Sequence, residues 1–327
     1  MPLTIGSPLL TPFQASLNLS HIYRKDPANL SGGPRKGRIH RVLTWNIERG
    51  LNHKRIAETV NEIGPDIACL QEVDWGNSRT GGRDILQDLA ENTGMLGFYG
   101  IEFLEIDSPL RNARFAGGGA IGNAFLTRIE PRDIFRIELP IGLDWANAGG
   151  DAAVPFAVRW RMRGEPRIGR RFALGMEMDV AGRQAVVACT HLEDKHGGVS
   201  SRWAQFEAIA RAVEARRNEG STAVIAGDMN TFDSRLARLI TRDRQSSALG
   251  KPVDVNEATW WSQNLLPATG FADPFPADAW TFRVPLFLRA KLDWLAIAGA
   301  PVTGKGAGAV GASDHRPIWA DISIADP

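Results

Sequence analysis

Several strand-like segments of the chain end in side chains that can do acid–base or metal chemistry. The clearest begins at Thr222 as a run of small and β-branched residues, stops at Gly227, and presents Asp228 and Asn230. Since side chains two residues apart in an extended chain point the same way, Asp228 and Asn230 are expected to project together. Such groups are costly to bury unless they bind a metal, a water or a substrate. A plain turn explains this single stretch equally well, because Gly, Asp and Asn are common turn residues.

The same arrangement recurs along the chain, which favours a site over a set of turns. Further apolar runs end in polar side chains, namely Asn46 with Glu48, Glu72, and His191. Asp293 lies inside another run, and Asp314 with His315 comes just before the last one. If these strand boundaries lie at one edge of a packed β core, they form one cluster rich in hard oxygen ligands. The repetition therefore indicates a metal-binding or catalytic centre.

The elements that must position this cluster alternate only in part between strands and helices. Strands are predicted at 41–46, 66–72, 98–106, 119–127, 172–180, 184–191, 222–228, 279–283, 291–297 and 317–324. Helices are predicted at 52–63, 83–92, 201–219 and 234–241, whereas 140–171 and 243–278 show no sustained period. This order favours a mixed two-sheet α+β or α/β core over a Rossmann sheet.

Length and composition are those of an ordinary globular protein. The 327 residues are 43% hydrophobic and 23% charged, enough for one sizeable core. The net charge of +1 gives no overall attraction to nucleic acid or anionic membrane, although local patches remain open. Residues 1–38 show no sustained period and are predicted to be an irregular N-terminal arm before a catalytic domain at 39–327.

The two cysteines and the N-terminus predict a cytoplasmic protein. Cys69 and Cys189 both lie inside apolar strand runs, so we interpret them as small core residues in a reducing compartment. No apolar run approaches transmembrane length, and no basic segment followed by an apolar one begins the chain.

Two groups of residues outside the cluster allow more than one interpretation. Arg111 and Arg114 precede a glycine run, and six more arginines lie between positions 159 and 171. These arginines suit phosphate contacts, but also a bare hairpin and a protected sheet edge, and the edge is slightly favoured for the second group. Trp260-Trp261, together with Phe287, suits either a lipid-facing rim or the packing of a loop, and packing is favoured.

Seven motifs in chain order resemble those of the endonuclease/exonuclease/phosphatase superfamily of metal-dependent phosphohydrolases. They are Thr44-Trp-Asn-Ile47, Leu70-Gln-Glu-Val73, Gly122-Asn-Ala-Phe-Leu-Thr127, Thr190-His-Leu192, Gly227-Asp-Met-Asn-Thr231, Leu292-Asp-Trp294 and Ser313-Asp-His-Arg-Pro317. Each is weak alone, but the ordered set is specific and covers about residues 40–324. The resemblance implies a DNase I-like α+β fold, an αββα four-layer sandwich of two mixed β-sheets flanked by helices, with the site at one end of the sheets.

The resemblance also implies a metal ion and its ligands. Glu72 is the expected principal ligand of Mg²⁺, assisted by Asn46 and Asp314, with Mn²⁺ as the second choice of ion. Hard oxygen ligands with several retained waters are what Mg²⁺ prefers.

Five further residues take catalytic roles by the same resemblance. Asp228 is expected to orient or deprotonate the attacking water, and Asn230 to hold that water or a phosphate oxygen. His315, polarised by Asp293, is expected to face the scissile phosphate. His191 is expected to donate a hydrogen bond to a non-bridging oxygen. Together these parts suffice for in-line displacement at phosphorus.

The expected activity is therefore Mg²⁺-dependent hydrolysis of a phosphodiester by an activated water. Nucleic acid, a phospholipid or inositol-phosphate headgroup and a small phosphodiester all remain open as the substrate. The alternative from another class is a protein that binds a phosphorylated ligand on the same fold without turnover. The complete motif set favours the enzyme.

Overall fold

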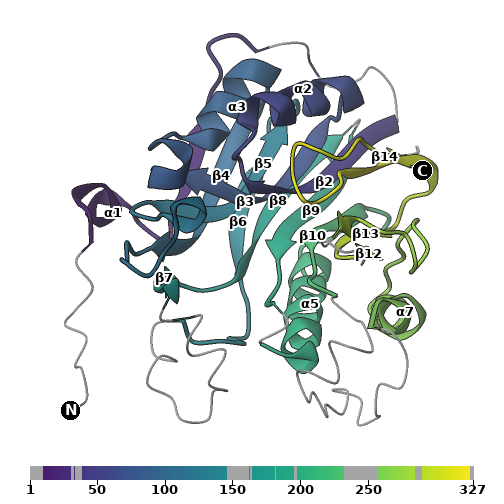
Figure 1. Ribbon diagram of the computed structural model, residues 1–327. Coiled ribbons are helices and arrows are strands. Elements are labelled where there is room, and N and C mark those ends of the chain that lie inside the picture. The colour runs from purple at the N-terminus through teal and green to yellow at the C-terminus, as the bar shows by residue number, and fades with distance from the viewer. Residues whose placement is uncertain are drawn as a thin grey trace.

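Two β-sheets pack face to face with helices on both outer faces (Figure 1). The computed structural model describes residues 10–30, 33, 39–145, 162, 164–180, 182–194, 197–231, 257–283 and 289–324. The larger sheet has the order β1 (Ile22–Lys25), β4 (Leu96–Glu105), β5 (Ala120–Thr127), β3 (Ile67–Trp75), β2 (Ile39–Arg49), β15 (Ile318–Ser323) and β14 (Val302–Ala307), with β7 (Arg167–Gly169) beside β4. The smaller has the order β13 (Asp293–Ala298), β10 (Thr222–Asp228), β9 (Arg183–His191), β8 (Phe172–Val180) and β6 (Asp133–Glu138).

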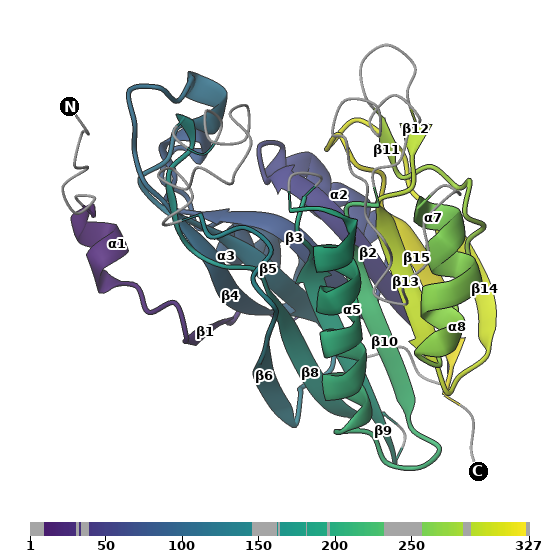
Figure 2. The same ribbon diagram turned by 90° about the horizontal axis from the view of Figure 1, so that it is seen from below.

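The helices complete four layers. α2 (His53–Ile63) and α3 (Ile85–Thr93) cover the larger sheet, where Val60 and Leu89 pack against strand residues such as Leu70. α5 (Val199–Glu214) covers the smaller sheet together with α7 (Glu257–Trp260) and α8 (Leu266–Ala268), as Figure 2 shows. A third apolar cluster fills the space between the sheets. The predicted αββα sandwich of the α+β class is therefore confirmed.

Both tryptophans of the ambiguous pair belong to the core. Trp260 stacks on Trp203 of α5 with ring centroids 3.9 Å apart, and Trp261 is fully buried. The interpretation as loop packing is thus confirmed for this pair, while Phe287 lies outside the described residues. None of the described helices is long and apolar enough to cross a membrane.

Several elements differ from the sequence-based expectation. The arm is not irregular at 12–16 and 22–25, where α1 (Pro12–Ser16) forms and β1 pairs with β4. β6, β14 and the α7–α8 segment were not predicted, and the predicted helix at 234–241 lies outside the described residues. The strand β14 was obscured by Gly304 and Gly306, which weaken any strand pattern. Gly306 is required because a Cβ there would lie 2.5 Å from the Trp319 ring.

The loss of Gln14 is expected to destabilise the fold, because this residue attaches α1 to the larger sheet. Its buried Nε2 donates to the carbonyls of Glu105 (3.0 Å) and Gly119 (2.9 Å). Gln14→Ala should lower the free energy of unfolding by about 1 to 3 kcal/mol, from two hydrogen bonds at about 0.5 to 1.5 kcal/mol each. Urea unfolding measures this, with the exposed Gln263→Ala as the control, and equal midpoints for both variants would show that α1 contributes nothing.

Candidate functional site

The polar cluster continues the inter-sheet core at one end of the sandwich. β2 runs parallel to β3, and β9 parallel to β10, so each pair brings its C-terminal residues to the same edge. Along β10, Ala226 faces the other sheet, and the alternation of the strand carries Asp228 to the same side. Cys189 and His191 on β9 follow the same rule. The strand period thus directs these polar side chains into one shared space.

The backbone departs from regular strand geometry at this edge. Glu48, Glu72 and Asn230 have positive φ values of 48°, 55° and 51°. The register of β3 against β5 shifts at Glu72, between Leu70 and Val73. Positive φ is unfavourable for residues with a side chain and is concentrated at functional sites. At this edge, the positive φ values interrupt the regular alternation of side chains along the strand.

Asp228 is the centre of the cluster. Its Oδ1 accepts a hydrogen bond from the backbone N–H of Asn230 at 2.9 Å, and its Oδ2 accepts one from Asn46 Nδ2 at 3.0 Å. The same Oδ2 lies 3.5 Å from His191 Nε2 and 3.7 Å from His315 Nε2. One buried carboxylate therefore faces an amide and two imidazoles from three different strands or loops.

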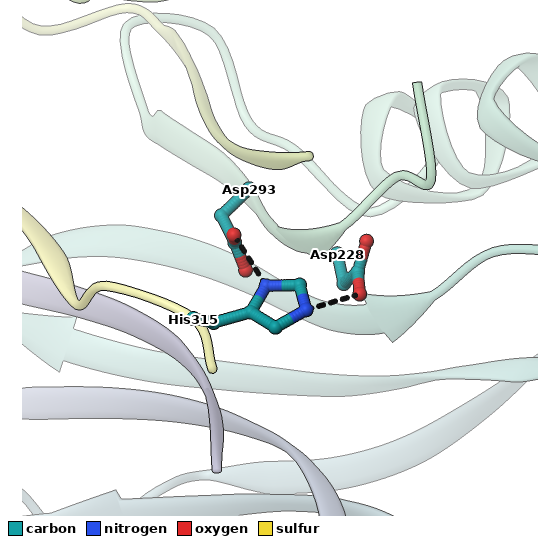
Figure 3. A group of neighbouring side chains, drawn as sticks. All are labelled: Asp228, Asp293 and His315. Carbon is teal, nitrogen blue, oxygen red and sulfur yellow. Dashed lines mark hydrogen bonds and ion pairs between the residues drawn. The ribbon is translucent and has the colours of Figure 1, made fainter. Parts of the chain in front are cut away.

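His315 lies between two carboxylates, as Figure 3 shows. Its Nδ1 is 2.8 Å from Asp293 Oδ2, and Asp293 is the register partner of Asp228 across β13 and β10. Burial lowers the pKa of His315, but the Asp293 and Asp228 carboxylates outweigh it and raise the pKa to about 10. His315 is therefore an imidazolium at neutral pH. Its backbone is held by Ser313 Oγ, which accepts from the His315 N–H, and by Trp45 Nε1, which donates to its carbonyl.

His191 has the opposite electrostatic character. Burial, reinforced by the nearby Arg171 guanidinium, lowers the pKa of His191 to about 4. Its Nδ1 has no hydrogen-bond partner in the described part of the chain. The site therefore pairs a charged imidazole with a neutral one.

The low pKa of His191 makes the stability of the protein depend on pH. The folded His191 takes up a proton near pH 4, whereas a free histidine does so near pH 6.5. Between these values an unfolded His191 binds more protons than the folded one, so the contribution of His191 to the free energy of unfolding should fall as the pH falls from 6.5 to 4. His191→Gln should lose less stability across this window than the wild type, measured by urea unfolding at each pH. The exposed His21→Gln is the control, and parallel curves for His191→Gln and the wild type would contradict this assignment.

Glu72 is kept anionic by its neighbours. Burial raises its pKa, but Arg49, 3.5 Å away from Nη1 to Oε2, and the two imidazoles bring the pKa well below the usual range. Asn46 Nδ2 donates to Glu72 Oε1 at 3.3 Å, while Asn46 Oδ1 accepts from the N–H of Glu48 at 3.1 Å. The amide nitrogen of Asn46 therefore faces Glu72, and its oxygen faces the turn.

Two further carboxylates, Glu48 and Asp314, lie near Glu72. The backbone N–H of Asp314 donates to Glu48 Oε2 at 3.1 Å. Burial, assisted by the negative charges of Glu72 and Glu48, raises the pKa of Asp314 to about 6. A hard divalent cation would relieve the repulsion between the Asp314 and Glu72 carboxylates.

A second group with metal-ligand geometry is better described as a hydrogen-bonded set. The ligand atoms of Asp228, Asp293 and His315 lie within 4.8 Å of one another. Within this group, His315 Nδ1 and Asp293 Oδ2 already hydrogen-bond each other at 2.8 Å.

Most of the arginines considered as phosphate contacts are engaged within the protein. Arg111 donates to three backbone carbonyls and is buried, and Arg167 pairs with Glu105 at 3.0 Å. Arg114 pairs with Glu48, and the exposed Arg170 lies 3.2 Å from Glu138. These arginines support the loop and sheet edge, as expected for the 159–171 group, whose members Arg159, Arg161 and Arg163 lie outside the described residues.

Arg171 was not predicted as a site residue, but it lies near His191. Its Nη1 donates to Glu102 Oε2 at 3.0 Å, and its buried Nε has no hydrogen-bond partner among the described residues. Asn123, from the motif on β5, donates to Glu102 Oε1 at 3.1 Å. No local signal separates Arg171 from the neighbouring arginines, because its role depends on strands that are distant in sequence.

The fold and site define a DNase I-like sandwich with a carboxylate and imidazole cluster at one end. The model of the Endonuclease/Exonuclease/phosphatase family matches residues 43–315, and the chain belongs to this family. Members of the family are typically metal-dependent phosphoester hydrolases.

Solved structures share the fold at low sequence identity. An endonuclease/exonuclease/phosphatase from Beutenbergia cavernae is 21% identical with a TM-score of 0.58, over 88% of this chain and 72% of that one. The human Nocturnin catalytic domain, with a bound sulfate anion, is 16% identical with a TM-score of 0.52, over 88% and 93%. TDP2 from D. rerio, complexed with a single-strand DNA product, is 13% identical with a TM-score of 0.50, over 87% and 98%. No curated protein matches the chain in sequence.

Proposed function

We propose that this protein is a cytoplasmic Mg²⁺-dependent phosphodiesterase. The single observation that carries the proposal is the convergence of Asp228 with His315, His191 and Asn46 beside the anionic Glu72. This cluster contains a buried carboxylate, a cationic imidazole, a neutral imidazole and a carboxylate that could bind a metal. These groups are sufficient for attack of water on phosphorus. The free thiols of Cys69 and Cys189, both buried, agree with a reducing compartment.

Glu72 and Asp314 would hold the ion, and Asn46, predicted as a third ligand, donates its Nδ2 to Glu72 Oε1 and would orient that carboxylate. When bound, Mg²⁺ supplies charge neutralisation at a phosphate oxygen, and Mn²⁺ would substitute for it. Arg49 keeps Glu72 anionic, so that the carboxylate is ready to bind at physiological pH.

Asp228 would accept the proton of the attacking water. Its Oδ1 is held by the Asn230 N–H, and Oδ2 points toward the imidazoles, so the carboxylate is fixed before substrate binds. Asn230 donates its Nδ2 to the Leu192 carbonyl at 2.9 Å, which orients its side-chain oxygen for a water. Preorganisation of this kind lowers the cost of reaching the transition state.

The two histidines would stabilise the phosphoryl group. His315, kept charged by Asp293, places a positive charge where negative charge grows on the phosphate. His191, neutral, would donate one hydrogen bond to another non-bridging oxygen. An incomplete site would favour the alternative of a binding protein without turnover, and the contacts among Asp228, Asn230, His191, Asp293 and His315 support the enzyme instead.

Hydrolysis of bis(4-nitrophenyl) phosphate by the purified protein tests the proposal. We expect turnover with Mg²⁺ or Mn²⁺, none after treatment with EDTA, and recovery when the ion is restored. Folding is checked by circular dichroism in each state. A folded, metal-loaded protein that leaves this diester, oligonucleotides, inositol phosphates and phospholipids all intact would contradict the proposed function, and tight phosphate-ligand binding in that protein would favour the alternative.

A further inference from the structure

A short hairpin that no sequence motif covers lies directly against His315. It consists of β11 (Phe282–Arg283) and β12 (Arg289–Ala290), and it stands at one end of the sandwich (Figure 2). Phe282 forms a β-bridge with His315, and their rings are 4.8 Å apart. The backbone N–H of Arg316 donates to the Thr281 carbonyl at 2.6 Å. Side chains of this hairpin are therefore neighbours of the proposed scissile phosphate.

Three arginines of this region are not neutralised. Arg283 and Arg289 are exposed and Arg316 is partly exposed. Within the described ranges, none of the three has a carboxylate within salt-bridge distance, and Arg316 Nε donates only to the Gly308 carbonyl at 2.9 Å. Among the described residues, therefore, no carboxylate neutralises the positive charge of this region.

The other arginines around the site are paired with carboxylates. Arg49 lies beside Glu72, and Arg114 beside Glu48. Arg171 pairs with Glu102. This contrast matters because an arginine without an acidic partner is available to an anionic ligand, whereas a paired one must first give up its partner.

The ring of Trp280 contacts two of the three arginines near the hairpin. The Arg289 and Arg316 guanidinium carbons lie 4.7 Å and 5.0 Å from the centroid of its ring. Cation–π contacts at this distance orient a guanidinium without neutralising its charge. Trp280 therefore contacts two cations next to the segment that packs against His315.

We propose that Arg289 and Arg316, positioned by Trp280, bind the phosphate adjacent to the scissile one in a single-stranded nucleic acid. The proposal rests on the proposed function, because it places the scissile phosphate at His315. Partly exposed aromatic rings between free arginines are typical of surfaces that follow a nucleic-acid strand. A lipid with a single phosphate leaves the pair without a ligand, and Trp260-Trp261, for which a lipid-facing rim was the less favoured interpretation, is buried.

Fluorescence anisotropy with labelled ten-residue oligothymidylate, in EDTA to prevent hydrolysis, tests the subsite. The double variant Arg289→Gln/Arg316→Gln should raise Kd at least about tenfold and reduce the slope of log K against log salt by about 1.4, since each single-strand phosphate contact contributes about 0.7. Arg132→Gln is the matched control and should leave both values unchanged. Arg132 is exposed and lies past the ends of β5 and β8 that point away from the site.

Competition by short ligands shows which phosphate is bound. In the wild type, trithymidylate with two phosphates should compete better than dithymidylate with one, and the double variant should abolish this ratio. An unchanged Kd for the ten-residue strand, an unchanged ratio, or binding only to phosphatidylinositol-bisphosphate vesicles would each overturn the proposal. Turnover of bis(4-nitrophenyl) phosphate by the wild type is measured separately, so failure of the proposed function is distinguished from failure of the subsite.

Discussion

Replacement of Asp228 by asparagine is expected to lower kcat for a phosphodiester by about 10²- to 10⁴-fold, the usual contribution of a general base. Asparagine keeps the size of the side chain, and its oxygen still accepts from the Asn230 N–H. It cannot accept a proton from water, and it presents an amide where Asn46 and the two histidines now meet an acceptor. The chemical step should therefore fail more than substrate binding, so kcat should fall and KM should change little.

The matched control for this change is Asp133→Asn. Asp133 is exposed at the start of β6 and pairs with Arg216 at 2.9 Å, away from the cluster. It should retain wild-type kinetics and stability, which excludes a general effect of removing a carboxylate. A folded Asp228→Asn protein with more than half of the wild-type kcat would remove Asp228 from the mechanism.

The second large effect is expected at the pair formed by Asp293 and His315. Asp293 is fully buried, and its Oδ2 hydrogen-bonds His315 Nδ1. Asp293→Asn should lower kcat by about 10²-fold or more, because the imidazole loses the charge that keeps it protonated. Removal of one partner from a buried pair also costs stability, here about 3 to 5 kcal/mol, which denaturant unfolding measures.

A double-mutant cycle separates the pair from two independent residues. If His315 acts only when Asp293 is present, His315→Gln, Asp293→Asn and the double variant should all show similar kcat values. Rate losses that multiply in the double variant would contradict a coupled pair. Asp179→Asn, on the exposed end of β8, controls for the loss of a carboxylate from the same sheet.

Much of the site was visible in the sequence because strand periodicity is local. Asp228 and His191 each follow an apolar run, and the motif order predicted that the runs would meet. The structure brings together Asn46, Glu72, His191, Asp228, Asn230, Asp293, Asp314 and His315 around one end of the sandwich. Their catalytic and metal-binding roles remain predictions.

What the sequence by itself determined is the apolar strands and the polar residues at their ends, since these depend on short-range periods, and the αββα fold class, which followed from the resemblance of the ordered motifs to a known family. Only the tertiary structure decided that His315 is charged while His191 is neutral, because each pKa follows from neighbours many residues away, Asp293 in one case and Arg171 in the other. The same holds for the arginines. The packing of Arg289 on Trp280 and the ion pair of Arg171 with Glu102 depend on which strands lie side by side. The sequence pattern does not predict which strands are neighbours.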